Sequence, residues 1–239
     1  MFRRAASVIL DMNGLIVDDE PIQLEAMNLA LARFGIVLTR SYWTGRCAGR
    51  RSEEFTRRIL SEHGLPNSAG AVSDIVSIKN ERYAGLVSKS VRAHTRPGVL
   101  DLVSFIHGNG DRTLSLATTA SPLEVEAVLG VRGLNIKSEF HSIVTGEDIS
   151  RHKPAPDIYL RVSALAGVRP GLCLVFEDSG PGVTAAKSAG MPCIAVPNES
   201  TAGQDFSGAA FIVSGLNREA RILNPQRRVL TGDSSETES

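Results

Sequence analysis

Short apolar runs recur along the chain, and helical patterns separate most of them. The runs lie at residues 6–10, 113–118, 141–145, 173–176, 192–196 and 210–213. They are largely uniform, which is typical of strands that are covered on both faces, as in a parallel sheet. From the second run onward, helical patterns follow over "SPLEVEAVL", "PDIYLRVSALAG" and "GVTAAKSAG". This alternation predicts a doubly wound α/β fold with a parallel, Rossmann-like sheet.

The segment between the first two runs departs from this rhythm. It contains the helical patterns "PIQLEAMNLALARFG" and "SEEFTRRILSEHG" but no convincing strand. We therefore expect a helical cap at residues 18–94, inserted into a core domain formed by residues 1–17 and 95–224. The last residues, 225–239, are rich in Ser, Thr, Asp and Glu. Such a composition does not support a core, so a disordered tail is expected there.

Composition narrows the class of ligand and the compartment. The chain has 239 residues, of which 26 are basic and 26 acidic. This balance gives no reason to expect nucleic acid or a membrane as partner, so a small molecule is expected. The three cysteines include no CxxC pair, which favours a reducing cytosol over a disulfide framework. The first apolar run is too short for a signal peptide or a membrane span. We expect a cytoplasmic protein, a monomer or weak dimer.

Polar residues follow the expected strands at their carboxyl ends, where open α/β sheets bind ligands. Three carboxylates placed there would repel one another, and a hard divalent cation with oxygen ligands would neutralise them. Magnesium fits better than zinc because no His or Cys is suitably spaced. The nearby hydroxyls and lysine suit a phosphate. The residues concerned are Asp11, Asn13, Thr118, Thr119, Lys153, Glu177 and Asp178.

Four of these segments resemble the ordered motifs of the haloacid dehalogenase superfamily, in its β-phosphoglucomutase-like branch of small-cap sugar-phosphate phosphatases and mutases. They are "DMNGLIVDDEP", "LATTASP", "HKPAPDIYL" and "VFEDSGPGVTAAKSAGM", and the resemblance spans about residues 6–200. It implies that Asp11 is the nucleophile that becomes an aspartyl phosphate. It also implies that Glu177 and Asp178 help to hold Mg²⁺, and that Asn13 lends its backbone carbonyl to the same ion.

The resemblance further implies that Thr118, with Thr119 beside it, and Lys153 grip the transferred phosphoryl group. Structural explanations compete with these roles. A threonine at a strand end is common, and Glu177 and Asp178 also suit the start of a helix, where acids complement the helix dipole.

Asn13 is the departure from the family pattern. The resembling phosphatases have a second aspartate there, which protonates the leaving oxygen and later takes a proton from water. An asparagine amide does neither near neutral pH, so we expect turnover slowed by about 10² to 10⁴. Asp18, Asp19 and Glu20, followed by Pro21, suit the start and hinge of the first cap helix rather than catalysis. Nothing in the sequence shows that Asp18 or Glu20 reaches the site.

Three functions remain open. The first is hydrolysis of a small phosphomonoester, such as a sugar phosphate, through an aspartyl phosphate. The second is a phosphomutase, which Gln23 disfavours because the resembling mutases have a histidine there. The third is a catalytically impaired phosphometabolite binder, which Asn13 favours. Arg50 and Arg51, in "GRCAGRRSEEF", either clamp a second anionic group or form a solvated basic face. The chain has no GxSxG, HExxH or GxxxxGK[ST] motif, which excludes those serine hydrolase, zincin and Walker-type classes.

Overall fold

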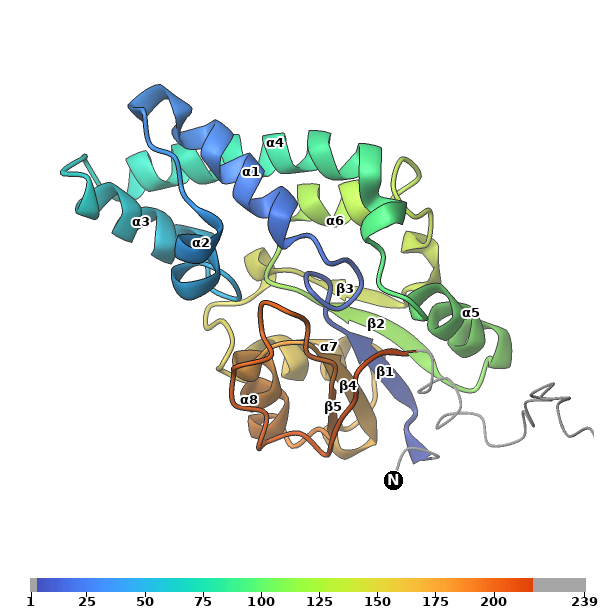
Figure 1. The fold of residues 1–239 in the computed structure, drawn as a ribbon. Helices are drawn as coiled ribbons and strands as arrows, with labels where there is room; N and C mark the ends of the chain where they lie inside the picture. Colours follow the sequence, from blue (N-terminus) through green and yellow to red (C-terminus); the bar gives the residue numbers. More distant parts are fainter. Residues whose placement is uncertain (1–3, 217–239) are drawn as a thin grey trace, which may run out of the picture.

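A parallel sheet forms the centre of the computed structural model, which describes residues 4–216 (Figure 1). Its strand order over these residues is β3-β2-β1-β4-β5-β6. The strands are β1 (Ser7–Leu10), β2 (Thr113–Ala117), β3 (Ser142–Val144), β4 (Cys173–Glu177), β5 (Cys193–Ala195) and β6 (Phe211–Ile212). Each strand coincides with one of the six apolar runs, β4 extending one residue beyond its run to Glu177, and neighbouring strands are parallel. The prediction of a doubly wound α/β fold is confirmed.

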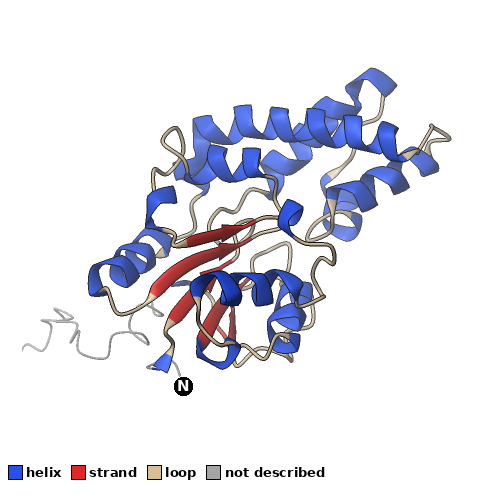
Figure 2. Ribbon diagram, turned by 180° about the vertical axis from the view of Figure 1, so that it is seen from behind, coloured by secondary structure: helices blue, strands red, loops and turns tan. Residues whose placement is uncertain are grey.

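Helices cover both faces of the sheet (Figure 2). They are α5 (Val99–Asn109), α6 (Pro122–Leu129), α7 (Asp157–Ala166) and α8 (Gly180–Ser188). On one face, Ile9 and Val175 pack with α7 and α8 in one buried cluster. On the other face, Leu10 belongs to a second cluster that includes α5. The sheet is therefore buried on both sides, as its uniform apolar strands require.

Two parts of the core differ from the expected alternation. Helix α5 precedes β2 and was not anticipated, although Val99, Leu102, Val103 and Ile106 have helical spacing and are buried. Residues 196–210, between β5 and β6, contain no helix. Instead, Asn198 Oδ1 accepts hydrogen bonds from the backbone N–H groups of Ser200 and Thr201, which closes a turn in a connection for which the sequence showed no helical pattern.

Four helices precede α5 in the connection from β1 to β2: α1 (Glu20–Leu31), α2 (Arg40–Arg46), α3 (Ser52–Glu62) and α4 (Ala69–His94). They sit beyond one end of the sheet (Figure 1) and share a hydrophobic cluster that includes Trp43 and Phe55. The second half of α4 joins the main core instead, through Tyr83 and Val87. None of the described helices is both long and apolar enough to cross a membrane. The expected tail, 225–239, lies outside the described residues.

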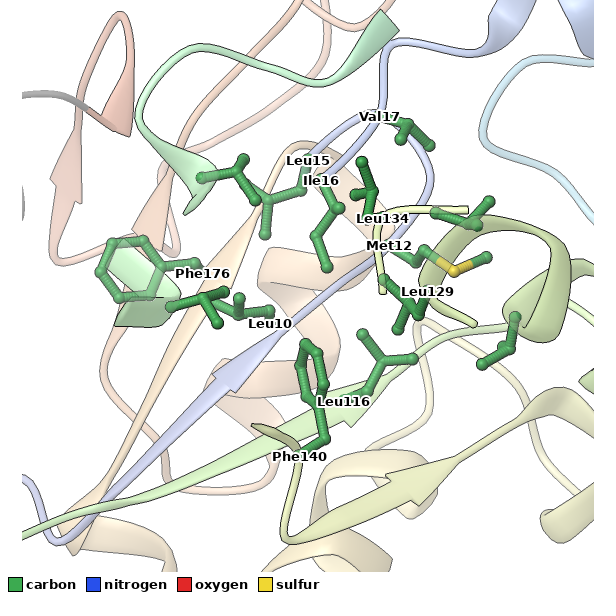
Figure 3. Close-up of a cluster of buried hydrophobic side chains, with 14 of the residues drawn as sticks. Leu10, Met12, Leu15, Ile16, Val17, Leu116, Leu129, Leu134, Phe140 and Phe176 are labelled. Carbon is green, nitrogen blue, oxygen red and sulfur yellow. The ribbon is translucent and has the colours of Figure 1, made fainter. Parts of the chain in front are cut away.

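The loop that follows β1 is anchored by apolar side chains (Figure 3). Met12, Leu15 and Ile16 are completely buried and join the cluster formed by the strands. Within the loop, the N–H of Gly14 donates to the carbonyl of Val17 at 2.7 Å. The packed core therefore fixes the position of the loop residues that lie between these buried side chains.

Candidate active site

Three buried carboxylates meet at the carboxyl ends of β1 and β4. Asp11 follows β1, and Glu177 and Asp178 lie at the end of β4. Their nearest oxygen atoms all lie within 4.8 Å of one another. The two strands are neighbours, and the N–H of Asp11 donates to the carbonyl of Phe176 at 3.1 Å. The register of two adjacent parallel strands thus brings together acids that are far apart in the sequence.

Lys153 supplies a positive charge to this cluster. Its Nζ atom donates to Asp11 Oδ1 at 2.6 Å and to Glu177 Oε1 at 2.5 Å, from the loop that precedes α7. Burial raises the pKa of Asp11 to about 7 against the attraction of Lys153. Burial also raises the pKa of Asp178 well above its usual range, reinforced by the charges of Glu177 and Asp11. When all three carboxylates are ionised, one lysine against three acids leaves a net charge of −2.

Glu177 is held through both of its oxygens. Besides Lys153, Tyr159 donates to Oε1 at 2.8 Å, and the backbone N–H groups of Asp178 and Ser179 each donate to Oε2 at 3.0 Å. A Cβ atom at Gly182 would overlap the Glu177 carboxylate, which explains the glycine in "SGPGV". Although burial opposes it, the pKa of Glu177 is lowered by Lys153 and these hydrogen bonds. Glu177 is therefore a fixed anion that orients Lys153.

Asp178 contacts the loop after β1. Its Oδ2 atom accepts a hydrogen bond from Asn198 Nδ2 at 2.8 Å, and the same amide donates to the carbonyl of Gly14 at 3.3 Å. Gly14 has φ +81°, and a Cβ atom there would overlap the Asp178 carboxylate. Asn198 was not among the site residues predicted from the sequence. It could have been predicted from its position just beyond β5, because that strand ends at the same edge of the sheet.

The two threonines after β2 occupy different surroundings. Thr118 is fully buried, and its hydroxyl accepts from the N–H of Ala120 at 3.1 Å and donates to Asn13 Oδ1 at 3.4 Å. Thr119 is exposed and lines the cavity above the cluster. In this structure Thr118 thus supports Asn13, whereas Thr119 is the threonine that reaches the cavity.

Asp19 lies beside Asn13, although the sequence predicted a helix-starting residue there. Asn13 Nδ2 donates to Asp19 Oδ2 at 2.6 Å, and Gln23 Nε2 and the Tyr83 hydroxyl donate to the same oxygen at 3.0 and 2.5 Å. Asp19 is 1% exposed, and its side chain makes no capping hydrogen bond to α1. The capping interpretation of this side chain was wrong because the side chain turns into the site. Burial raises the pKa of Asp19 despite its three donors.

The neighbouring acids point elsewhere. Asp18 is exposed, and its N–H donates to the carbonyl of His94 at 2.8 Å. Glu20 accepts a hydrogen bond from the Trp43 indole, and burial raises the pKa of Glu20 to about 7. Of these three consecutive acids, Asp19 is the one that contacts Asn13.

A cavity of about 1120 Å³ lies over these groups, between the inserted helices and the sheet. Arg50 and Arg51 reach it from the insert, but they lie near Glu54 and Glu53 at 3.7 and 3.5 Å and are about half exposed. The cavity is large enough for a small metabolite, with anionic and cationic groups at its base. Its other lining residues include Asp11, Asn13, Asp19, Thr119, His152, Lys153 and Asp178.

Comparison with known proteins places these features in a family context. The model of the haloacid dehalogenase-like hydrolase family matches residues 8–196. The phosphorylated carbohydrates phosphatase of Thermotoga maritima is 30% identical over 94% of this chain and 99% of its own. The fructose-1-phosphate phosphatase YqaB of Escherichia coli K12 is 29% identical over 82% of this chain and 98% of its own. A crystal structure of a CbbY mutant from Rhodobacter sphaeroides, in complex with xylulose-(1,5)bisphosphate, is 27% identical with a TM-score of 0.80, covering 89% of this chain and 95% of that one.

Proposed function

The chain belongs to the haloacid dehalogenase-like hydrolase family, and on that premise we propose that it is a Mg²⁺-dependent phosphatase of a small phosphorylated metabolite. A sugar phosphate is the substrate class that the named relatives favour. The observation that carries the proposal is the buried cluster of Asp11, Asp178 and Lys153 at the base of the cavity. These neighbouring groups support the proposal because they could serve as a carboxylate nucleophile, as cation ligands and as a phosphate-binding charge.

The donor set fits a magnesium ion. Carboxylate oxygens are hard ligands, and the net charge of −2 on the ionised cluster matches a divalent cation. Asp11 and Asp178 would hold the ion together with Glu177 and the backbone carbonyl of Asn13. Lys153 and Tyr159 already occupy Glu177 Oε1, so Glu177 contributes most through its charge. When bound, the ion neutralises the dianionic phosphate and so allows it to approach a carboxylate.

In this proposal, different residues carry out the attack on phosphorus and the binding of the phosphoryl group. Lys153 holds Asp11 through Oδ1, and we assign the attack on phosphorus to the second oxygen, Oδ2. The attack forms an aspartyl phosphate and releases the alcohol. Lys153 and Thr119 lie where they would bind the transferred phosphoryl group, while Thr118 supports Asn13 from below. Water then attacks the phosphoenzyme and regenerates Asp11.

Two alternative functions are each judged from the identity of a single residue. A phosphomutase is disfavoured because Gln23 donates its amide to Asp19 and Glu124, at 3.0 and 3.4 Å, and carries no titratable group. An impaired phosphometabolite binder is favoured by Asn13, whose amide transfers no proton near neutral pH. If no other carboxyl replaces it, turnover falls by about 10² to 10⁴.

The proposal is tested by phosphate release from fructose 1-phosphate and p-nitrophenyl phosphate, with Mg²⁺ or with EDTA. We expect hydrolysis by the wild type with Mg²⁺ and none by Asp11→Ala. Asp74→Ala, an exposed aspartate on α4, is the matched control and should retain activity. Hydrolysis that survives both EDTA and Asp11→Ala would contradict the proposal. Isomerisation of a sugar phosphate without phosphate release would establish the mutase instead.

A further inference from the structure

We propose that Asn198 is a positioning residue for the cation, because it holds one oxygen of Asp178 and leaves the other oxygen for the metal. The inference rests on the proposed function only in placing a divalent cation at this cluster. It starts from the side-chain amide of Asn198, just beyond β5. The Nδ2 atom donates to Asp178 Oδ2 at 2.8 Å and to the carbonyl of Gly14 at 3.3 Å. One amide group thus links a carboxylate of the cluster to the loop after β1.

The other end of the Asn198 side chain is bound to its own loop. Its Oδ1 atom accepts from the N–H groups of Ser200 and Thr201 at 2.8 and 3.1 Å, and from the Thr201 hydroxyl at 3.2 Å. Within residues 4–216, every partner of Oδ1 is a donor and both partners of Nδ2 are acceptors, which fixes the orientation of the amide. The oxygen therefore closes the turn, while the nitrogen holds the carboxylate.

The guanidinium group of Arg96 fixes the two backbone segments that this amide joins. Its Nη1 atom donates to the carbonyls of Gly14 and Val196 at 2.7 and 3.0 Å, and its Nη2 atom donates to the carbonyl of Pro197 at 3.2 Å. Hydrogen bonds from a charged donor are roughly twice as strong as neutral ones. Because Val196 and Pro197 directly precede Asn198, the amide starts from a backbone that is anchored to the loop after β1.

The hydrogen bond from Asn198 determines which oxygen of Asp178 is left for a cation. Asp178 is 5% exposed and lines the cavity, and the donor to its side chain among the described residues binds Oδ2. The cation shared with Asp11 is therefore left with Oδ1. Mg²⁺ requires nearly octahedral geometry, whereas Ca²⁺ also accepts carboxylates that bind through both oxygens. A carboxylate held by one of its oxygens thus favours Mg²⁺ over Ca²⁺.

Two substitutions at Asn198 separate the contact with the carboxylate from the turn. Asn198→Ser loses the amide donor but keeps an oxygen for the turn, because a serine hydroxyl closes such turns more weakly than asparagine does. Asn198→Ala loses both the donor and the acceptor. The matched control is Asn67→Ser, which makes the same change at an exposed asparagine between α3 and α4.

Cation binding is measured on the substrate-free protein, with free Mn²⁺ counted by its EPR signal and Mg²⁺ or Ca²⁺ added as competitor. We expect both Asn198 variants to bind Mg²⁺ about 10- to 100-fold more weakly than the wild type, as when a group that orients a metal ligand is lost. Their affinity for Ca²⁺ should fall by no more than about threefold. Asn67→Ser should bind both ions as the wild type does. Urea unfolding should show that Asn198→Ala is less stable than Asn198→Ser, which keeps the turn acceptor.

The possible results separate this role from the proposed function. If the wild type binds Mg²⁺ and folded Asn198→Ser binds it within about threefold of the wild type, the role of Asn198 is wrong. A loss confined to Asn198→Ala would make Asn198 a residue of the turn alone. Equal losses of Mg²⁺ and Ca²⁺ affinity would contradict the assignment of one Asp178 oxygen to the cation.

Activity is measured separately on the wild type with fructose 1-phosphate and p-nitrophenyl phosphate. If it binds Mg²⁺ but hydrolyses neither compound, the proposed function is wrong, while the weaker Mg²⁺ binding of Asn198→Ser still supports the role of Asn198. A wild type that binds no divalent cation contradicts both proposals.

Discussion

Helix α6 carries two glutamates, two residues apart, each paired with a lysine in a different environment. Glu124 pairs with Lys79 at 2.9 Å, and their side chains are 5% and 4% exposed. Glu126 pairs with Lys137 at 2.7 Å, and their side chains are 55% and 48% exposed. We predict that Glu124→Gln lowers the free energy of unfolding by about 3 to 5 kcal/mol, because it leaves a buried ammonium unpaired. Glu126→Gln should lower it by about 0 to 1 kcal/mol, since water replaces the lost partner.

The structure explains why a glutamine does not repair the buried site. Glu124 Oε1 accepts from Lys79, while Oε2 accepts from the N–H and the hydroxyl of Ser121, at 2.9 and 3.0 Å. Among the described residues, every hydrogen-bond partner of these two atoms is a donor, so the NH₂ group of a glutamine must face another donor. The loss of a charge and the clash of two donors both lower the free energy of unfolding. Neither cost arises at Glu126, which is on the surface.

Urea unfolding of the two variants measures the difference, with equal m-values as the condition for comparison. The double variant Lys79→Met/Glu124→Leu removes both charges and should recover most of the lost free energy. Lys79 and Ser121 lower the pKa of Glu124 from 4.5 against the effect of burial. The stabilisation by Glu124 is therefore present above about pH 4.5 and is lost as the pH falls through its lowered pKa. Equal losses for Glu124→Gln and Glu126→Gln would refute the reasoning, because burial would then have no effect on the pair.

Three further predictions concern the site. Lys153→Ala should lower kcat/KM by about 2 to 4 kcal/mol of transition-state stabilisation, and unchanged activity would place the phosphate elsewhere. Gly182→Ala should abolish hydrolysis and lower Tm, because its Cβ atom overlaps Glu177, whereas Gly171→Ala has open space and should leave both unchanged. Replacing Arg50 and Arg51 by alanine should raise KM for a sugar bisphosphate more than for a monophosphate, and equal KM ratios would assign both residues to a solvated surface.

The sheet was predictable because its strands are short and uniformly apolar, which leaves few alternatives to a parallel, two-sided core. Helix α5 was missed although Val99 and Val103 have helical spacing, because the apolar positions of that segment also resemble a buried strand. The connection from β5 to β6 showed no helical pattern in the sequence, and the structure has no helix there. The side chain of Asn198 closes a turn there, and such local bonds compete with helix formation without changing the apolar pattern.

The site was predictable where strand ends determine it. Asp11, Glu177 and Asp178 come together because adjacent parallel strands end at the same edge, and their order in the sequence is enough to state this. Tyr159 and Tyr83 were not predictable. They reach the site from inside helices, and their orientation depends on how those helices pack.

Asp19 was predicted only to start a helix, although its side chain belongs to the site. An acid before Pro21 suits a helix terminus electrostatically, whichever way its side chain points. The direction is set by the connection between the sheet and the inserted helices, where Val17 pairs with Thr95 and the N–H of Asp18 bonds to His94. With Asp18 exposed, Asp19 turns inward to Asn13. The absence of a carboxyl at one motif position thus says little about catalysis until the side chains that contact that position are known.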